Sequence, residues 1–230
     1  SIYLVDSIVS GIYAQGFLKE KYRKKTVLAV WGAAYFLIQI ALYDNLDNRF
    51  SISEVVGIIV NVCVLLFLQF LLFEKDMQKQ FFVAVSFVAG RETVKYIVSV
   101  FSTVHYELSN KILNDFLKKG IINTVVKTQI WVGIFTCIVI ILCALLYTLL
   151  LSVFLCLISK KFVKKEYLLQ TQENIFLILP CIAALCISVT IKMMIISVEN
   201  GMTIIIYDTV PATRFWIPVI CVLLLSTIVA

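Results

Sequence analysis

Seven long apolar segments constrain the fold of this chain more than any other feature. They are residues 2–18, 26–43, 55–73, 81–104, 125–158, 174–198 and 214–230. At about 1.5 Å per residue, each segment is long enough, or nearly so, to cross the roughly 30 Å hydrocarbon core of a bilayer as a helix. Hydrophobic residues make up 61% of the chain, well above the roughly 45–50% of a soluble domain. The sequence therefore predicts an all-α, polytopic integral membrane bundle of about seven transmembrane helices, forming one domain over residues 1–230.

Basic residues between the apolar segments predict the orientation of the bundle. Eleven lie in connections that would share one side: Lys19, Lys21, Arg23, Lys24, Lys25, Lys75, Lys79, Lys160, Lys161, Lys164 and Lys165. Six are expected on the other side: Arg49, Lys111, Lys118, Lys119, Lys127 and Arg214. Because short cytoplasmic loops accumulate Lys and Arg, we expect the N-terminus outside and the C-terminus in the cytoplasm of a multi-pass cell-membrane protein.

The connection at residues 105–124 has an amphipathic pattern. Leu108, Ile112 and Phe116 recur every four residues, with polar residues between them. This spacing places apolar side chains on one face of a helix. We expect an interfacial amphipathic helix over about 107–119, ended by Gly120, because Gly often follows the last residue of a helix.

Three charged residues, Arg91, Glu92 and Lys95, lie near the middle of the 81–104 segment. Charges inside a membrane are costly and usually face the bundle interior or a water-filled cavity. Arg91 and Lys95 are four residues apart and share a helix face, while Glu92 and Lys95 are three apart and can pair. Two interpretations stay open: a ligand-binding or signal-relay site, and a self-neutralising cluster that only packs.

Other charged residues in the apolar segments and loops are also ambiguous. Lys192 lies near the outer end of the 174–198 segment, where its side chain can reach the interface or pair with Glu92 or a ligand carboxylate. Asp208 is either a turn residue ahead of Pro211 or an acid that faces a ligand. Asp6 lies within the first segment and has an ambiguity similar to that of Lys192.

Proline, glycine and neutral polar residues predict structural features. Pro180 is expected to kink its helix, because it lacks a backbone N–H donor. Further kink or turn positions are Gly201, Pro211 and Pro218. Small residues spaced as Ser86 and Gly90 indicate a close approach of two helices. Neutral polar residues expected to hydrogen-bond between helices are Gln39, Asn61 and Gln69.

No catalytic constellation is visible in the sequence. It has no Walker loop, GxSxG, HExxH or GxGxxG motif, and its single histidine is His105. The cysteines lie in apolar segments without a CxxC pair, which predicts buried free thiols and no zinc site: Cys63, Cys137, Cys143, Cys156, Cys181, Cys186 and Cys221. We therefore expect no catalytic residue, metal or cofactor here, and the scattered basic residues are unlike a nucleic-acid interface.

The last third of the chain resembles a known receptor family. The resemblance rests on three stretches: Glu173-Asn174-Ile175-Phe176-Leu177-Ile178-Leu179-Pro180, Ile206-Tyr207-Asp208-Thr209-Val210-Pro211 and Phe215-Trp216-Ile217-Pro218. Over roughly 60 residues it is similar to the final two membrane spans of GHKL-type sensor histidine kinases of Gram-positive bacteria, which include the agr-type quorum-sensing receptors. The positions that match recurring family residues are Glu173, Pro180, Asp208, Pro211 and Pro218. Their roles in the family are structural, so the resemblance transfers no binding site.

This resemblance implies a homodimeric receptor in a Gram-positive plasma membrane. Its bundle would sense an extracellular or lipid-borne signal, often a peptide, and relay it to a cytoplasmic kinase and response regulator. The phospho-acceptor histidine and the ATP-binding domain would follow Ala230, so ATP and Mg²⁺ are expected only there. The alternative is a small polytopic transporter or export factor, although no inverted repeat is visible. A long Glu/Lys-rich helix containing a histidine after Ala230 would favour the receptor.

Overall fold

A computed structural model describes residues 2–46, 52–119, 125–163 and 178–187. These residues form five long helices, α1 (Ile2–Phe17), α2 (Lys24–Leu46), α3 (Ile52–Leu72), α4 (Met77–Lys118) and α5 (Val125–Val163). A shorter apolar helix covers Ile178–Ile187. Within these ranges there is no β-strand, only an isolated bridge between Glu20 and Phe73. The all-α prediction is confirmed.

The ends of the first three helices follow the predicted apolar segments. Segments 2–18, 26–43 and 55–73 correspond to α1, α2 and α3 within a few residues, and segment 125–158 lies inside α5. Charged residues end each apolar run, and the helices extend up to a few residues past them, as at Lys24 and Lys25 of α2. The segment 174–198 is described only at residues 178–187, where Pro180 lies in the helix. The segment 214–230 lies outside the described residues.

Helix α4 differs from the sequence prediction. We expected a span ending near residue 104 and a separate interfacial helix over about 107–119, but α4 runs from Met77 to Lys118 without a break. No Gly or Pro occurs between Gly90 and Gly120, so nothing interrupts the helical hydrogen-bond ladder. Asp76 caps the start by accepting from the Lys79 N–H at 3.2 Å. The helix ends with Lys119 as its C-cap, as the position of Gly120 predicted.

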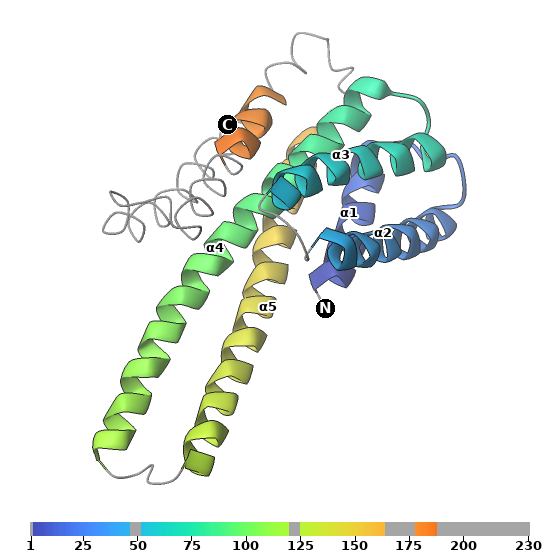
Figure 1. Cartoon of the computed structure of the whole chain (residues 1–230). Helices are drawn as coiled ribbons and strands as arrows, with labels where there is room; N and C mark the ends of the chain where they lie inside the picture. The colour runs from blue at the N-terminus through green and yellow to red at the C-terminus, as the bar shows by residue number, and fades with distance from the viewer. Residues whose placement is uncertain (1, 47–51, 120–124, 164–177, 188–230) are drawn as a thin grey trace.

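Helices α4 and α5 form a long antiparallel hairpin (Figure 1). With 42 residues, α4 is about 63 Å long, roughly twice the hydrocarbon thickness of a bilayer. Helices α1, α2 and α3 pack around one half of the hairpin, and the other half extends past them (Figure 1). Phe116 and Trp131 hold the two helices together near the tip, with ring centroids 5.6 Å apart.

Two connections are joined to each other at the end of the bundle opposite the hairpin tip. We call residues 18–23, between α1 and α2, and residues 73–76, between α3 and α4, the paired loops. Lys21 N–H donates to Leu72 C=O at 3.1 Å, and Glu74 N–H donates to Lys19 C=O at 2.8 Å. The α5 residue Ser159 lies near this end as well, since a Cβ on Gly16 would approach its Oγ to 3.1 Å.

Close helix packing at the predicted small-residue pair is present. A Cβ added to Gly90 of α4 would lie 2.6 Å from the Phe154 ring of α5. Ser86, one turn earlier, hydrogen-bonds to Tyr13 OH of α1 at 2.9 Å. Only a residue without a side chain at position 90 lets α5 approach this closely, so Ser86 and Gly90 together seat α4 between α1 and α5.

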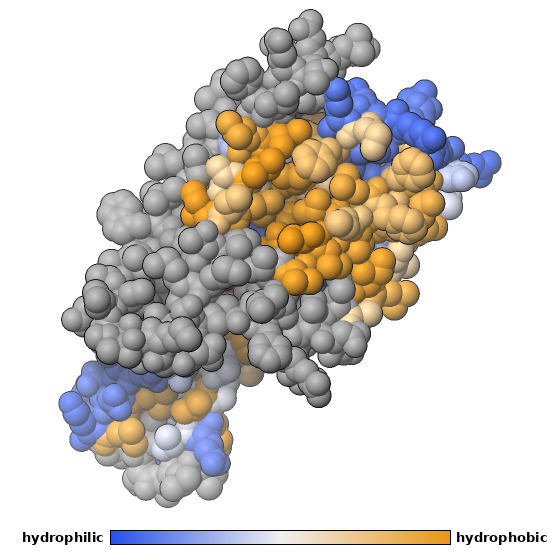
Figure 2. Space-filling model, turned by 45° about the horizontal axis from the view of Figure 1, so that its top comes forward, coloured by the Kyte–Doolittle hydropathy of each residue, from blue (hydrophilic) through white to orange (hydrophobic). Residues whose placement is uncertain are grey.

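Apolar side chains cover the outside of the described bundle. Exposed large hydrophobic residues occur on all five long helices, among them Ile12, Leu37, Phe67, Phe81 and Leu145. Figure 2 shows a broad hydrophobic surface next to a cluster of hydrophilic residues at the upper right. One helix in the described ranges, Lys127–Ser159, is long and apolar enough to cross a membrane on its own, and Val56–Leu72 and Ile178–Ile187 are apolar but shorter. One of the seven predicted transmembrane helices therefore has the length and composition of a membrane span in the structure, and the other six remain predictions.

Candidate functional site

The three charged residues predicted on α4 are held together inside the bundle. Arg91 is 4% exposed and Glu92 is 1% exposed. The Arg91 guanidinium donates to Glu92 Oε1 from Nε at 3.3 Å and from Nη2 at 3.2 Å. Lys95 Nζ lies 3.2 Å from the same Glu92 oxygen, while its side chain stays 37% exposed. Lys95 is therefore the partly open edge of an otherwise buried group.

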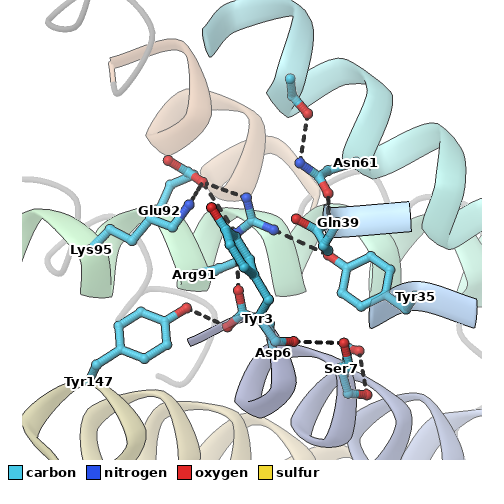
Figure 3. Close-up of polar contacts among 12 residues, drawn as sticks. Tyr3, Asp6, Ser7, Tyr35, Gln39, Asn61, Arg91, Glu92, Lys95 and Tyr147 are labelled. Carbon is cyan, nitrogen blue, oxygen red and sulfur yellow. Dashed lines mark hydrogen bonds and ion pairs between the residues drawn. The ribbon is translucent and has the colours of Figure 1, made fainter. Parts of the chain in front are cut away.

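Helices α1 and α5 add a second acid and a phenol. Asp6 of α1 is 1% exposed, and its Oδ2 lies 3.9 Å from Arg91 Nε. Tyr147 OH of α5 donates to Asp6 Oδ1 at 2.5 Å. The remaining oxygen, Asp6 Oδ2, has no hydrogen-bond donor among the described residues. Asp6 is thus held by one hydrogen bond and one longer ionic contact (Figure 3).

Helices α2 and α3 extend the group on the other side of Arg91. Arg91 Nη1 donates to Tyr35 OH at 3.2 Å, and Tyr35 OH donates to Asn61 Oδ1 at 3.4 Å. Gln39 Nε2 also donates to Asn61 Oδ1, and Asn61 Nδ2 donates to Gly57 C=O at 2.7 Å. Gln39 and Asn61 therefore hydrogen-bond between helices, as predicted. We call the whole set the charge network: Asp6, Tyr35, Gln39, Asn61, Arg91, Glu92, Lys95 and Tyr147.

The charge network joins all five long helices at a similar depth. One member of each helix, namely Asp6, Tyr35, Asn61, Arg91 and Tyr147, lies roughly 11 to 16 residues from the helix end nearest the paired loops. This corresponds to about 17–24 Å along the helix axis. If the paired loops lie at a membrane interface, the network is close to the middle of a hydrocarbon core about 30 Å thick.

The network also lies where the hairpin leaves the other helices. In α4 the buried residues run from Phe82 to Val94, and from Lys95 toward the tip only Leu113 is buried among those described. In α5 the first buried residue is Tyr147, and the residues described before it are exposed or partly exposed. Arg91 and Tyr147, which contact Asp6, therefore lie near the end of the buried part of the hairpin.

The charges of the network balance. Two cationic side chains, Arg91 and Lys95, face two acidic ones, Asp6 and Glu92. Burying any one of these ions alone is costly, and removal of one partner leaves an uncompensated charge in a medium of low dielectric constant. Arg91 thus lies between two acids, Glu92 beside it in the sequence and Asp6 from a distant helix.

Other predicted site residues fall outside the described ranges. These are Lys192, Gly201, Asp208, Pro211 and Pro218. Gln69 is buried, but its Oε1 has no hydrogen-bond donor among the described residues, so the predicted interhelical bond is not formed by that atom. The geometry brings together the three charged residues predicted on one helix, Arg91, Glu92 and Lys95.

Two tyrosines of the network were not identified from the sequence. Tyr35 and Tyr147 are at most 1% exposed and carry the contacts that connect α2 and α5 to the charges. A phenol in the middle of an apolar segment is a usable signal, because a buried hydroxyl needs a partner. A second polar contact of this kind joins Trp31 Nε1 to Ser10 Oγ at 2.9 Å.

The described residues include six of the seven cysteines and the single histidine. Six cysteines are free thiols there, and of these only Cys181 is buried, so the predicted burial is wrong for Cys63, Cys137, Cys156 and Cys186, which are exposed. Within the same ranges, no group of three or more His, Cys, Asp or Glu side chains is placed to hold a metal. His105 packs against Phe101, with ring centroids 4.3 Å apart.

Comparisons with protein-family models, curated proteins and solved structures found no match to this chain. The similarity to GHKL-type kinases therefore remains a prediction from the residues quoted above.

Proposed function

We propose that this chain is the multi-pass membrane sensor domain of a receptor histidine kinase, and that its charge network relays the signal. The observation that carries the proposal is the convergence of buried charges from α1 and α4, with phenols and amides from α2, α3 and α5, where the hairpin leaves the bundle. Side chains that contact each other from five helices are well placed to respond when the helices move between two arrangements.

The distribution of polar and apolar residues supports the membrane placement. Large apolar side chains are exposed, whereas polar residues such as Asp6, Ser10, Asn61, Arg91 and Glu92 are buried. A soluble protein has the reverse preference, because water favours polar groups at the surface. In a bilayer, polar groups are expected to turn inward, so lipid is the natural solvent of the exposed face.

The proposed topology places the paired loops in the cytoplasm and the hairpin tip outside. Five of the basic residues predicted inside precede or begin α2, and Lys75 and Lys79 adjoin the second loop. The basic residues predicted outside include Lys111, Lys118 and Lys119, near the far end of α4. The backbone hydrogen bonds between the two loops support a position on the same side of the membrane for these seven basic residues.

In this mechanism the signal acts on the hairpin. An extracellular ligand, such as a peptide, would change the hairpin's position only through a difference in its affinity for two arrangements. Helix displacements of about 1–2 Å are typical of such switches. Contacts of 3.2–3.9 Å between Arg91 and its two acids cannot survive a shift of that size unchanged. The network would then stabilise one arrangement over the other.

The partners of the receptor follow from the proposal. The domain would act as a homodimer in the lipid bilayer, and a kinase portion outside this chain would bind ATP and Mg²⁺. That portion would pass its phosphoryl group to a response regulator.

The decisive experiment measures histidine phosphorylation in membranes that contain the complete natural protein. Asp6→Asn should change basal phosphorylation by about 5-fold or more, the lower limit of typical allosteric coupling. Asp115→Asn removes an exposed acid from the same protein far along α4 and should leave phosphorylation within about 2-fold. Equal effects of the two variants would contradict a relay role for the network.

A transporter is the second candidate, and the mid-depth position of the charges favours it, because charged residues within membranes often mark ion or proton pathways. Membranes without phosphohistidine, together with substrate flux in proteoliposomes that is lost in Asp6→Asn, would support the transporter and reject the receptor.

A further inference from the structure

The paired loops and the first residues of the helices that follow them form one surface at one end of the bundle, which we call the platform (residues 18–25 and 73–79). Their backbones share two hydrogen bonds, and Lys19 Nζ adds an ion pair to Glu74 Oε1 at 3.1 Å. Lys21 Nζ donates to Phe70 C=O at 2.7 Å and to Leu71 C=O at 3.4 Å. These carbonyls belong to the last turn of α3, where a cation is favourable. The platform is thus held in place by contacts that use Lys19 and Lys21.

Other basic side chains on the platform do not hold the two loops together. Arg23, Lys24, Lys25 and Lys75 are exposed, and the structure records no ion pair for any of them among the described residues. Lys75 Nζ lies over the Phe70 ring at 5.3 Å, which keeps its charge on the surface beside an exposed aromatic side chain. Residues 18–25 and 73–79 together contain seven basic and three acidic residues, so the platform is strongly positive.

The positive charge at the start of α2 is not compensated within its own helix. Lys24 and Lys25 are its first two residues, and the first turn contains no acidic residue. Cations are unfavourable at a helix N-terminus, where the macrodipole is positive. An anion from outside the chain would relieve this repulsion.

Apolar side chains lie next to the basic residues of the platform and indicate that the anion belongs to a lipid headgroup. Tyr22 is 62% exposed, Met77 78% and Phe70 46%, all next to the basic residues. Amphipathic and aromatic residues of this kind favour the boundary between headgroups and acyl chains. Cationic residues in the same layer meet lipid phosphates, which attract juxtamembrane Lys and Arg.

We propose that Arg23, Lys24, Lys25 and Lys75 bind the phosphate groups of anionic phospholipids, such as phosphatidylglycerol, in the leaflet that contacts the paired loops. The proposal rests on the membrane placement above. Bound lipid would neutralise the start of α2 and hold the platform at the headgroup layer, which sets the depth of the charge network.

The test compares two triple variants of the purified chain. One carries Arg23→Gln, Lys24→Gln and Lys25→Gln. The control carries Lys111→Gln, Lys118→Gln and Lys119→Gln, which removes three exposed positive charges from α4 at the other end of the bundle. Retention of phosphatidylglycerol and phosphatidylcholine is measured by native mass spectrometry from detergent micelles. Each basic residue near a charged surface contributes about 5-fold to binding.

We expect the platform variant to lose at least about 10-fold in phosphatidylglycerol affinity, while the control changes less than about 3-fold. Neither should change phosphatidylcholine retention. Equal losses in both variants, or no loss in the platform variant, would overturn the proposal. The platform variant should fold, because removing cations from a helix N-terminus favours the helix; the single change Lys25→Gln gives a second, milder test.

A separate measurement tests whether the chain is inserted in the membrane, independently of its lipid preference. If the unmodified chain can be extracted from phosphatidylglycerol vesicles with alkaline carbonate, the multi-pass proposal fails. If it stays inserted but shows no preference for phosphatidylglycerol, only the lipid site fails.

Discussion

At the scale of single residues, Asp6 is held by fewer contacts than Glu92, the other acid of the charge network. Its Oδ1 accepts one hydrogen bond, from Tyr147, and its Oδ2 has only the 3.9 Å approach of Arg91. Arg91 by contrast contacts Asp6, Glu92 and Tyr35. Substitution of Tyr147 therefore removes the one hydrogen bond that the Asp6 carboxylate accepts among the described residues.

Tyr147→Phe should destabilise the protein by about 1–3 kcal/mol, because Asp6 loses its hydrogen-bond donor while remaining buried. The measurement is the midpoint of denaturant unfolding in detergent micelles. Tyr106→Phe is the matched control, since Tyr106 is 64% exposed, and it should stay within about 0.5 kcal/mol. A Tyr147→Phe protein as stable as the unmodified one would show that the phenol does not hold Asp6.

A double-mutant cycle tests the pairing of Arg91 with Glu92. Arg91→Ala alone should cost about 3–5 kcal/mol, because it leaves buried carboxylates without their main cation. Combined with Glu92→Ala, the loss should be smaller than the sum of the two single losses. Arg91→Ala combined with Asp76→Ala should be additive, because Asp76 pairs with Lys79 in the paired loops. Additivity in both cycles would place Arg91 and Glu92 in independent environments.

At the scale of helices, the fit of α4 against α5 depends on a missing side chain. Gly90→Ala should destabilise the bundle by about 1–3 kcal/mol, because the new Cβ meets the Phe154 ring at 2.6 Å. Gly133→Ala is the control in α5, where a Cβ has nothing within 4 Å. It should stabilise the helix by up to about 1 kcal/mol. Adding Phe154→Leu should recover part of the Gly90→Ala loss, and thermal unfolding in micelles measures all three.

At the scale of the whole molecule, the proposed topology predicts which ends of the bundle are accessible from outside the cell. In a cysteine-free background, Asn110→Cys near the hairpin tip should react with an impermeant thiol reagent in intact cells. Lys25→Cys at the start of α2, next to the paired loops, should react only after the membrane is opened. Both positions are exposed side chains, so a difference in labelling reflects the side of the membrane. Labelling of Lys25→Cys in intact cells would invert the orientation.

The sequence alone predicted the positions of α1, α2 and α3 to within a few residues, and the reason is local. Apolar runs and the charged residues that end them set the limits of α1, α2 and α3, since burying a backbone in an apolar medium requires its hydrogen bonds to close within the helix. The pairing of Glu92 with Lys95 was likewise predictable, because residues three apart meet on one helix face. The continuous α4 shows the limit of this approach, because polar residues suggested an interface where the backbone had no reason to stop.

The assembly of the site was decided only by tertiary structure. Nothing in the local pattern relates Asp6 to Arg91, or Tyr147 to Asp6, because helix periodicity describes one helix at a time. Which faces meet depends on the close fit of Gly90 against Phe154 and on the joined loops that align the helix ends. Those contacts place five separate polar groups at one depth, where the cost of an isolated buried charge makes them pair with each other.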